Sequence, residues 1–326
     1  MKKALVILIL ALFVATGAFA QFTVGGQIWT DFGVNMELGN NFSFADNSSW
    51  IFNWNTGNTR IQANYTRADG DVTGWIRWRV NGSVRGEASA NVGPGALQIG
   101  FQEAIARYSS LDFLNNGNGG IGASALNVHP YIRYRVAGLQ IGISEAGKIH
   151  NGGFSANPFP GIFAGYDMSV AGINLGIAAA ALPAKNGDVT VFPFMANVRA
   201  GIGDIGPATI GVNVALYSNP QFGFFAVTGG PGAALTTRIG DTNLLVLEGL
   251  LDVVIDLGNA NVIATGGVVT NFDSNIPGLA IQGGLCLGVP LVQGFTVYPG
   301  LIYNTMLNVE GSADELAVGV SLVYRF

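Results

Sequence analysis

The last residues of the chain alternate between two kinds of side chain. Large apolar residues occupy every second position from Leu316 to Phe326, and those between them are mostly small, polar or charged, with Val323 the exception. A period of two is that of a β-strand, whose successive side chains point to opposite faces. A strand with one apolar and one polar face suits a barrel wall between lipid and a watery lumen. The chain is therefore predicted to end in a membrane-crossing strand.

The composition supports this interpretation for the rest of the chain. Hydrophobic residues make up 49% of the sequence and charged residues only 11%, against about 25% charged in a typical soluble domain. After Ala20, however, no uninterrupted apolar stretch approaches the ~20 residues that a membrane-spanning helix needs. Only helices and closed barrels satisfy all backbone hydrogen bonds in lipid. A closed barrel is the architecture that remains.

The first residues have the pattern of an export signal. Two lysines precede an apolar run over residues 4–15, and Ala18 and Ala20 form a small-x-small cleavage site. The run is too short to span a bilayer comfortably, which favours a cleaved signal peptide over a membrane anchor. We expect a signal peptide at 1–20 and a single outer-membrane β-barrel domain at 21–326.

Alternation recurs between turn signals along the whole mature chain. Short turns, such as Ala137-Gly138 and Ala171-Gly172, alternate with longer connections rich in Asn, Gly and Ser. This asymmetry is typical of up-and-down transmembrane barrels, which have short periplasmic turns and longer external loops. The fold class is therefore all-β, a transmembrane antiparallel up-and-down β-barrel of about 16 strands, with 14 or 18 as alternatives. The expected strands are 22–36, 58–67, 71–80, 83–92, 96–108, 128–136, 139–147, 161–170, 173–182, 189–202, 208–218, 243–257, 261–271, 278–289, 294–304 and 315–326.

The terminal strand also resembles a known sequence feature. An aromatic C-terminus preceded by alternating apolar residues is similar to the closing strand of bacterial outer-membrane β-barrels. The resemblance implies that Leu322, Tyr324 and Phe326 form the signal read by the barrel-assembly machinery, and that the barrel is porin-like and surrounded by outer-membrane lipid. The composition, low in Lys and rich in Gly, Ala and Asn, is also similar to that of spirochaetal outer-membrane proteins.

Charged residues on the inward faces are candidates for the pore lining. If strand twelve of a 16-stranded barrel lies across the lumen from strands four and five, basic residues face acidic ones. A transverse field of this kind would orient dipolar solutes and set ion preference. The alternative is that these are ordinary solvated residues that avoid lipid. The basic candidates are Arg77, Arg79, Arg85, Arg133 and Arg135, with Arg60 nearby, and the acidic ones are Glu248, Asp252 and Asp256.

The connection at 109–127 follows the fifth strand. In general porins the loop at this place folds into the barrel and narrows it, and this segment is similar in position and in Gly and Asn content. Its only acidic residue in the first part is Asp112. Inward folding and a plain external loop both remain open, and we expect the external loop.

The leading functional hypothesis is a channel for passive diffusion of small hydrophilic solutes, with homo-oligomers possible. A non-conducting surface protein with partner-binding loops and a hydrophobic-substrate transporter are the alternatives. The net charge of −5 argues against nucleic acid as a partner. The two histidines, His129 and His150, lie in no recognisable nucleophile or metal arrangement, so we expect no enzymatic activity, cofactor or metal. The single cysteine, Cys286, is predicted to be an inward-facing filler.

Overall fold

A computed structural model of the chain shows one large antiparallel β-sheet. It describes residues 20–38, 49–54, 59–101, 103–107, 125–128, 131–144, 161–181, 184–186, 189–191, 194–218, 225–226, 245–272, 279–307 and 314–326. Most of the expected signal peptide, including Ala18, lies outside these ranges, and Ala20 is the first residue of β1. Within the described ranges, no helix has the length and apolar character needed to cross a membrane.

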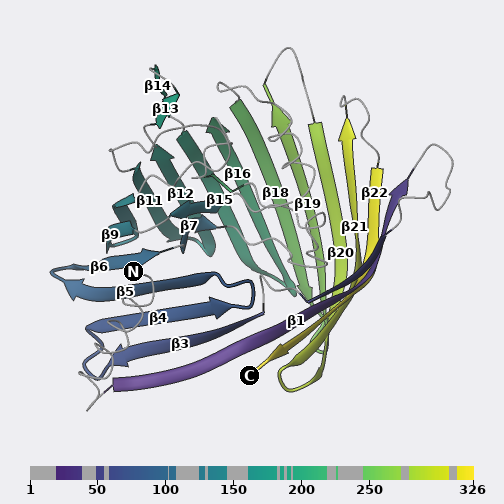
Figure 1. The fold of residues 1–326 in the computed structure, drawn as a ribbon, viewed down its shortest axis with the longest axis horizontal. Coiled ribbons are helices and arrows are strands. Elements are labelled where there is room, and N and C mark those ends of the chain that lie inside the picture. Colours follow the sequence, from purple (N-terminus) through teal and green to yellow (C-terminus); the bar gives the residue numbers. More distant parts are fainter. Residues whose placement is uncertain are drawn as a thin grey trace.

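The sheet closes on itself into a 16-strand, all-antiparallel barrel. Each strand pairs with the next one along the barrel, and β22 pairs with β1 to complete the ring. In Figure 1 the long strands from β18 to β22 run side by side, and β1 passes from β22 towards β3. The barrel strands are β1 (Ala20–Leu38), β3 (Arg60–Arg67), β4 (Val72–Arg79), β5 (Val84–Val92), β6 (Gly95–Phe101), β9 (Tyr131–Val136), β10 (Leu139–Ser144), β11 (Gly161–Val170), β12 (Ile173–Ala181), β15 (Phe194–Ile205), β16 (Ala208–Ser218), β18 (Leu245–Asp256), β19 (Asn261–Asn271), β20 (Leu279–Val292), β21 (Phe295–Leu307) and β22 (Asp314–Arg325).

One further strand, β2 (Ser49–Trp54), belongs to the same wall. Its residues pair with the second half of β1, from Thr30 opposite Trp54 onwards, while β3 pairs with the first half of β1. β2 and β3 therefore occupy a single position in the ring. No strand was expected between residues 36 and 58, which is wrong for 49–54 because these residues continue the ladder on β1.

Short turns gather at one rim of the barrel. The two-residue turns Ala137-Gly138 and Ala171-Gly172 have positive φ at both positions, 46° and 84° in the first and 51° and 80° in the second. That conformation matches the right-handed twist of the paired strands. The opposite rim carries the longer connections, with one exception at 80–83, where β4 and β5 join through a tight turn. The predicted alternation of turn lengths is confirmed, with this single tight turn added.

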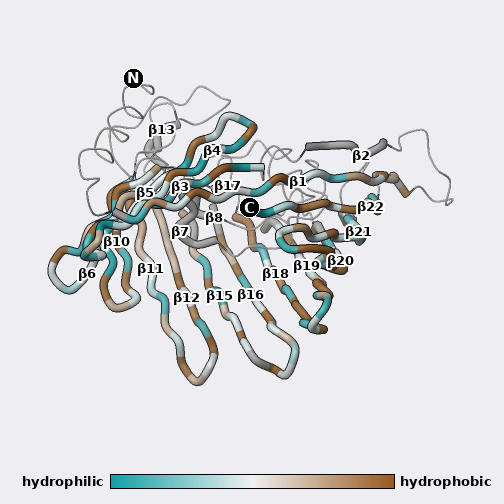
Figure 2. Tube along the Cα trace, turned by 90° about the horizontal axis from the view of Figure 1, so that it is seen from below, coloured by the Kyte–Doolittle hydropathy of each residue, from teal (hydrophilic) through white to brown (hydrophobic). Residues whose placement is uncertain are grey.

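The two faces of the wall differ as the alternation predicts. Hydrophobic and hydrophilic residues alternate along most strands in Figure 2. Exposed aromatic side chains lie towards the rims: Phe22, Tyr324 and Phe326 at the short-turn rim, and Phe194 and Phe272 at the other, as expected for aromatic girdles at the membrane interfaces. Exposed aliphatic residues on the outward face include Ile99, Ile132, Ile141, Ile162, Ile177, Val198, Leu251, Leu285, Leu301 and Val318.

A second sheet, of three strands, has no described strand pairing with the wall. We call it the inner sheet. It consists of β7 (Glu103–Arg107), β8 (Ala125–Val128) and β17 (Phe225–Ala226), in the order β17-β8-β7. β7 contacts both β5 and β12, which lie on different parts of the wall. The described residues on either side of this connection, 103–107 and 125–128, therefore belong to the inner sheet. The external loop expected at 109–127 falls almost wholly outside the described residues and stays a prediction. Residues 108–124 lie outside the described ranges.

The inner sheet and a small hairpin explain the strand boundaries that were predicted incorrectly. The expected strands 96–108 and 128–136 each divide between the wall and the inner sheet. The expected strand 189–202 begins too early, because β14 (Val189–Val191) pairs with β13 (Ala184–Asn186) and the wall resumes at Phe194.

The closing residue of the barrel packs against a glycine of the first strand. The backbones of Phe326 and Gly26 exchange two hydrogen bonds, of 3.0 and 3.1 Å. A Cβ atom on Gly26 would lie 2.6 Å from the Phe326 Cζ and 2.7 Å from the Arg60 carbonyl oxygen. The Phe326 ring, stacked on Tyr324 with centroids 6.0 Å apart, thus occupies the space that a side chain would take.

We expect Gly26→Ala to weaken barrel closure, because the added methyl group must displace Phe326 or the β3 backbone. Overpacking of this kind costs about 1–3 kcal/mol. The free energy of unfolding of the barrel in urea, measured in detergent or liposomes, should fall accordingly. Gly266→Ala in β19 is the matched control, because nothing lies within 4 Å of its Cβ position. Equal stability of the two variants would contradict the role assigned to Gly26.

Candidate functional site

Four arginines form a compact cluster on the inner face of neighbouring strands. Arg60 of β3 lies directly opposite Arg79 of β4, and Arg77 of β4 lies directly opposite Arg85 of β5. We call these four residues the arginine cluster. Like charges at directly opposite positions of a ladder destabilise the sheet, so the arrangement favours anions nearby. Three of the four residues were predicted to line the pore, and the fourth, Arg60, to lie nearby.

The cluster is partly fixed by its neighbours. The Arg77 Nε donates a hydrogen bond of 2.8 Å to Gln62 Oε1 on the adjacent strand. The Arg77 guanidinium also lies 5.1 Å from the centroid of the Trp75 ring, a favourable cation–π distance. Trp75 therefore points inward, as its position in the alternation predicts, and it orients one arginine of the cluster.

Arg133 has a different role from the cluster. Its Nη2 forms an ion pair of 2.6 Å with Glu87 Oε2 on β5, and only 8% of the Arg133 and 11% of the Glu87 side chain is exposed. The Arg133 Nε donates to Gln98 at 2.6 Å and its Nη1 to Gln140 at 3.3 Å. The Tyr131 hydroxyl donates to the same Glu87 carboxylate. The positive charge of Arg133 is therefore neutralised inside a network that joins β5, β6, β9 and β10.

The remaining predicted basic residue, Arg135, is exposed one residue before the end of β9. It lies opposite Gln140 and Ala96 at the short-turn side of the barrel. The five predicted arginines are thus divided into three in the cluster, one in the buried network and one near the rim.

The predicted acidic residues lie on the opposite wall. β18 is the twelfth strand of the ring and β5 the fourth, so eight of 16 places, half the circumference, separate them. Glu248 and Asp252 point inward and are 1% and 7% exposed. Asp256 is exposed at the short-turn rim, where its carboxylate accepts a hydrogen bond of 2.7 Å from the Gly258 N–H. Glu248 and Asp252 therefore face the half of the barrel that carries the arginine cluster.

A buried carboxylate at the closing seam was not singled out from the sequence. Asp31 of β1 is fully buried and accepts hydrogen bonds from Ser321 Oγ of β22 at 2.5 Å and from Trp29 Nε1 at 2.8 Å. Trp29 stacks on Tyr298 with ring centroids 6.3 Å apart. Strand parity places Trp29, Asp31 and Ser321 on the inner face, but only the register of the seam brings the last two together.

A second inward ion pair crosses an intervening strand. Arg199 of β15 pairs with Asp167 of β11, and Gly176 of β12 lies between them. A side chain at Gly176 would collide with both partners, so the glycine is what permits the contact. This pair is less buried than Arg133–Glu87, with 29% of the Arg199 and 32% of the Asp167 side chain exposed. Cys286 is buried in a small apolar cluster with Ile302 and Ala317.

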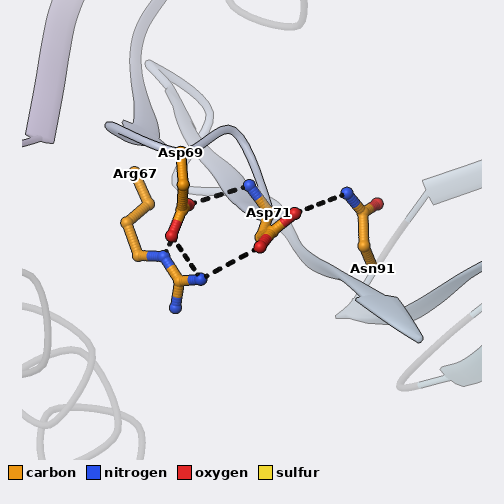
Figure 3. A network of polar contacts seen from close by, with 4 residues as sticks. All are labelled: Arg67, Asp69, Asp71 and Asn91. Atoms are coloured by element: carbon orange, nitrogen blue, oxygen red, sulfur yellow. Dashed lines mark hydrogen bonds and ion pairs between the residues drawn. The ribbon is translucent and has the colours of Figure 1, made fainter. Parts of the chain in front are cut away.

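At the short-turn rim, hydrogen bonds and ion pairs between charged residues stabilise the β3–β4 turn (Figure 3). The Arg67 Nε donates to Asp69 Oδ1 at 2.7 Å, and Arg67 Nη2 lies 3.4 Å from Asp71 Oδ2. Asp71 in turn accepts a hydrogen bond of 3.2 Å from the Asn91 side chain on β5. The hydrogen bond from Arg67, and then that from the Asp71 N–H, hold the pKa of Asp69 below its ordinary value.

This turn should loosen only in strong acid. Because the folded pKa of Asp69 is depressed, its contacts are fully present above the ordinary pKa of about 3.9 and are lost as the pH falls through the lower, folded pKa. The Asp71 amide proton shift in an NMR titration of the micelle-bound protein should follow Asp69, with a midpoint below the ordinary value. Asp69→Asn should abolish that transition. A midpoint at or above the ordinary value would contradict the proposed contact.

Comparison with known proteins places this barrel among porins by fold. No protein-family model and no curated protein matches the sequence. Solved structures do match: an anion-selective porin from Comamonas acidovorans (13% identity, 94% of this chain and 100% of the other, TM-score 0.64) and the outer membrane channel DcaP of Acinetobacter baumannii (13%, 95% and 98%, TM-score 0.73). OmpF of Salmonella typhi in complex with daunomycin also matches (13%, 94% and 97%, TM-score 0.54). The chain is therefore a porin-like barrel in architecture.

Proposed function

We propose that this protein is an outer-membrane channel for passive diffusion of small hydrophilic solutes, with a preference for anions. The observation that carries the proposal is the arginine cluster on the inner face of a closed 16-strand barrel. Four guanidinium groups on neighbouring strands create a positive potential that attracts anions and repels cations. Selection would then combine sieving by lumen width with this electrostatic preference.

The likeness to porins supports the channel class, and one neighbour is named as anion-selective. On the same proposal, the signal peptide directs export, and the closing strand with Leu322, Tyr324 and Phe326 engages the assembly machinery in the outer membrane. Another neighbour, OmpT of Vibrio cholerae, is described in a trimer form, and a homo-oligomer is part of our proposal for this chain. The proposed activity is transport and involves no catalysis.

Planar-bilayer recording of the refolded protein tests the proposal directly. We expect discrete conductance steps and, in a salt gradient, a reversal potential displaced towards that of the anion. A folded barrel, verified by its heat-dependent mobility in gels, that gives no conductance steps would overturn the channel proposal. Steps with a cation preference would overturn the role of the arginine cluster while leaving the channel intact.

One observation favours the second candidate, a non-conducting surface or structural protein. Much of the described inner face is buried, including Asp31, Asn213, Glu248 and Ser321, and β7 of the inner sheet contacts two separate parts of the ring, β5 and β12. A lumen filled in this way would not conduct. The conductance measurement separates the two candidates.

A further inference from the structure

A threonine on the wall opposite the arginine cluster has a buried hydroxyl group that makes no hydrogen bond. Thr265 of β19 is 7% exposed, and its Oγ1 atom has no hydrogen-bond partner. Asp252 of β18 lies directly opposite Thr265 and is also 7% exposed. A hydroxyl that leaves water without regaining a hydrogen bond costs free energy. Such an atom in a native structure marks a position where a water molecule or an ion binds.

The residues beside this pair on the ladder have no side chains. Gly211 of β16 lies directly opposite Asp252, and Gly284 of β20 lies directly opposite Thr265. Neither glycine can therefore offer a side-chain donor or acceptor to the pair. The next inward residue of β18, Leu250, is apolar and only 3% exposed. A ligand between Asp252 and Thr265 would thus be held in a site that is largely removed from bulk water.

The charges of this wall indicate the kind of ligand. The wall strands β16, β18, β19, β20 and β21 contain no lysine or arginine within their described bounds, whereas β18 carries Glu248, Asp252 and Asp256. Carboxylate and hydroxyl oxygens are ligands of hard cations. The pair of Asp252 and Thr265 carries one negative charge, which one monovalent cation balances. A divalent ion would leave an excess charge, which is costly where water is largely excluded.

We propose that Asp252 and Thr265 bind a sodium ion in the barrel wall. The Asp252 carboxylate supplies the charge and Thr265 Oγ1 supplies an uncharged oxygen ligand. Backbone carbonyl oxygens, each with a second lone pair, and water are further ligands that such an ion accepts. The bound ion balances the charge of Asp252, so this wall repels anions less than its acidic residues alone would. The inference does not depend on the channel proposal, because the ion stabilises the wall whether or not the lumen conducts.

The stability of the refolded barrel in sodium chloride tests the site. Urea unfolding is measured at constant total chloride, with choline replacing sodium. Because the ion binds the folded protein, the unfolding equilibrium constant should fall tenfold for each tenfold rise in sodium above the dissociation constant. Thr265→Val and Asp252→Asn should each abolish this dependence. In choline chloride, Thr265→Val should be at least as stable as the native protein, because it removes an unsatisfied hydroxyl group.

Thr209→Val and Asp256→Asn are the matched controls. Thr209 is exposed on the inner face of β16, and Asp256 is exposed at the end of the strand that carries Asp252. Both variants should keep the native dependence on sodium.

Three outcomes would overturn the inference. Equal stability of the native protein in sodium and choline chloride would leave water as the ligand of Thr265. A sodium dependence that survives both Thr265→Val and Asp252→Asn would place the ion elsewhere. A response to calcium chloride at matched ionic strength, without a response to sodium, would contradict the assignment of a monovalent ion. None of these measurements uses conductance, so the site and the channel proposal are tested separately.

Discussion

Replacing Arg77, Arg79 and Arg85 together by glutamine should shift the reversal potential in a salt gradient towards that of the cation. These three charges belong to the arginine cluster, in which each residue lies directly opposite another arginine on the adjacent strand. An arginine charge and a permeating anion 4 Å apart in water attract each other by about 1 kcal/mol. Loss of this attraction should lower the anion-to-cation permeability ratio about fivefold. Glutamine keeps the polarity and much of the length of each side chain, so barrel stability should change little.

Arg67→Gln is the matched control for this experiment. It removes one positive charge from the short-turn rim, where Arg67 is paired with Asp69, and it should barely affect selectivity. High salt should reduce the difference between the native protein and the triple variant, because exposed charges are screened within about 10 Å at 0.1 M. An unchanged reversal potential in the triple variant would show that the cluster does not determine ion preference.

Glu87→Gln should destabilise the barrel far more than it changes selectivity. The substitution leaves the Arg133 guanidinium buried beside a neutral amide, and removing one partner of a buried ion pair costs about 3–5 kcal/mol. The Glu87 carboxylate also accepts hydrogen bonds from Tyr131 and Gln98, so the loss affects contacts among three strands, β5, β6 and β9. Urea unfolding of the refolded barrel, followed by tryptophan fluorescence, measures the effect.

Two comparisons separate charge burial from a general loss of contacts. Asp167→Asn breaks the more exposed pair with Arg199 and should cost no more than about 1 kcal/mol, in the range of exposed ion pairs. The double variant Glu87→Gln/Arg133→Gln removes both charges and should recover part of the stability that Glu87→Gln loses. A double variant less stable than Glu87→Gln would contradict the idea that the unpaired charge causes the loss.

The number of strands and the assignment of faces could be predicted from the sequence because both depend on local alternation. Inward Asp31 and outward Ile28, for example, are separated by three positions in a strand and so must point to opposite faces. Turn signals such as Ala171-Gly172 are also local, so the positions of the short turns could be predicted from them. The 16 expected strands correspond closely to the 16 positions of the ring.

Contacts between strands could not be predicted in the same way. Arg133 was expected to line the pore, but its partner Glu87 is 46 residues away and is brought near only by the registers of β5, β6 and β9. The inner sheet was missed because β8 and β17 are short and come from separate connections, so neither carries an alternation long enough to identify a partner. β2 was missed because residues 55–59 separate it from β3 in the sequence.

The hydrogen bond from Ser321 to Asp31 joins residues 290 positions apart in the chain. Contacts this distant in sequence are entropically costly and form late, since loop closure must precede them. Every other pairing in the described wall joins strands that follow one another along the chain. The β1–β22 pairing, in contrast, cannot form until the final strand is present. Until then the growing sheet exposes two unpaired edges, each able to pair with another chain. The order in which this protein matures is therefore set by its last strand, and a truncated copy would persist as an open, aggregation-prone sheet.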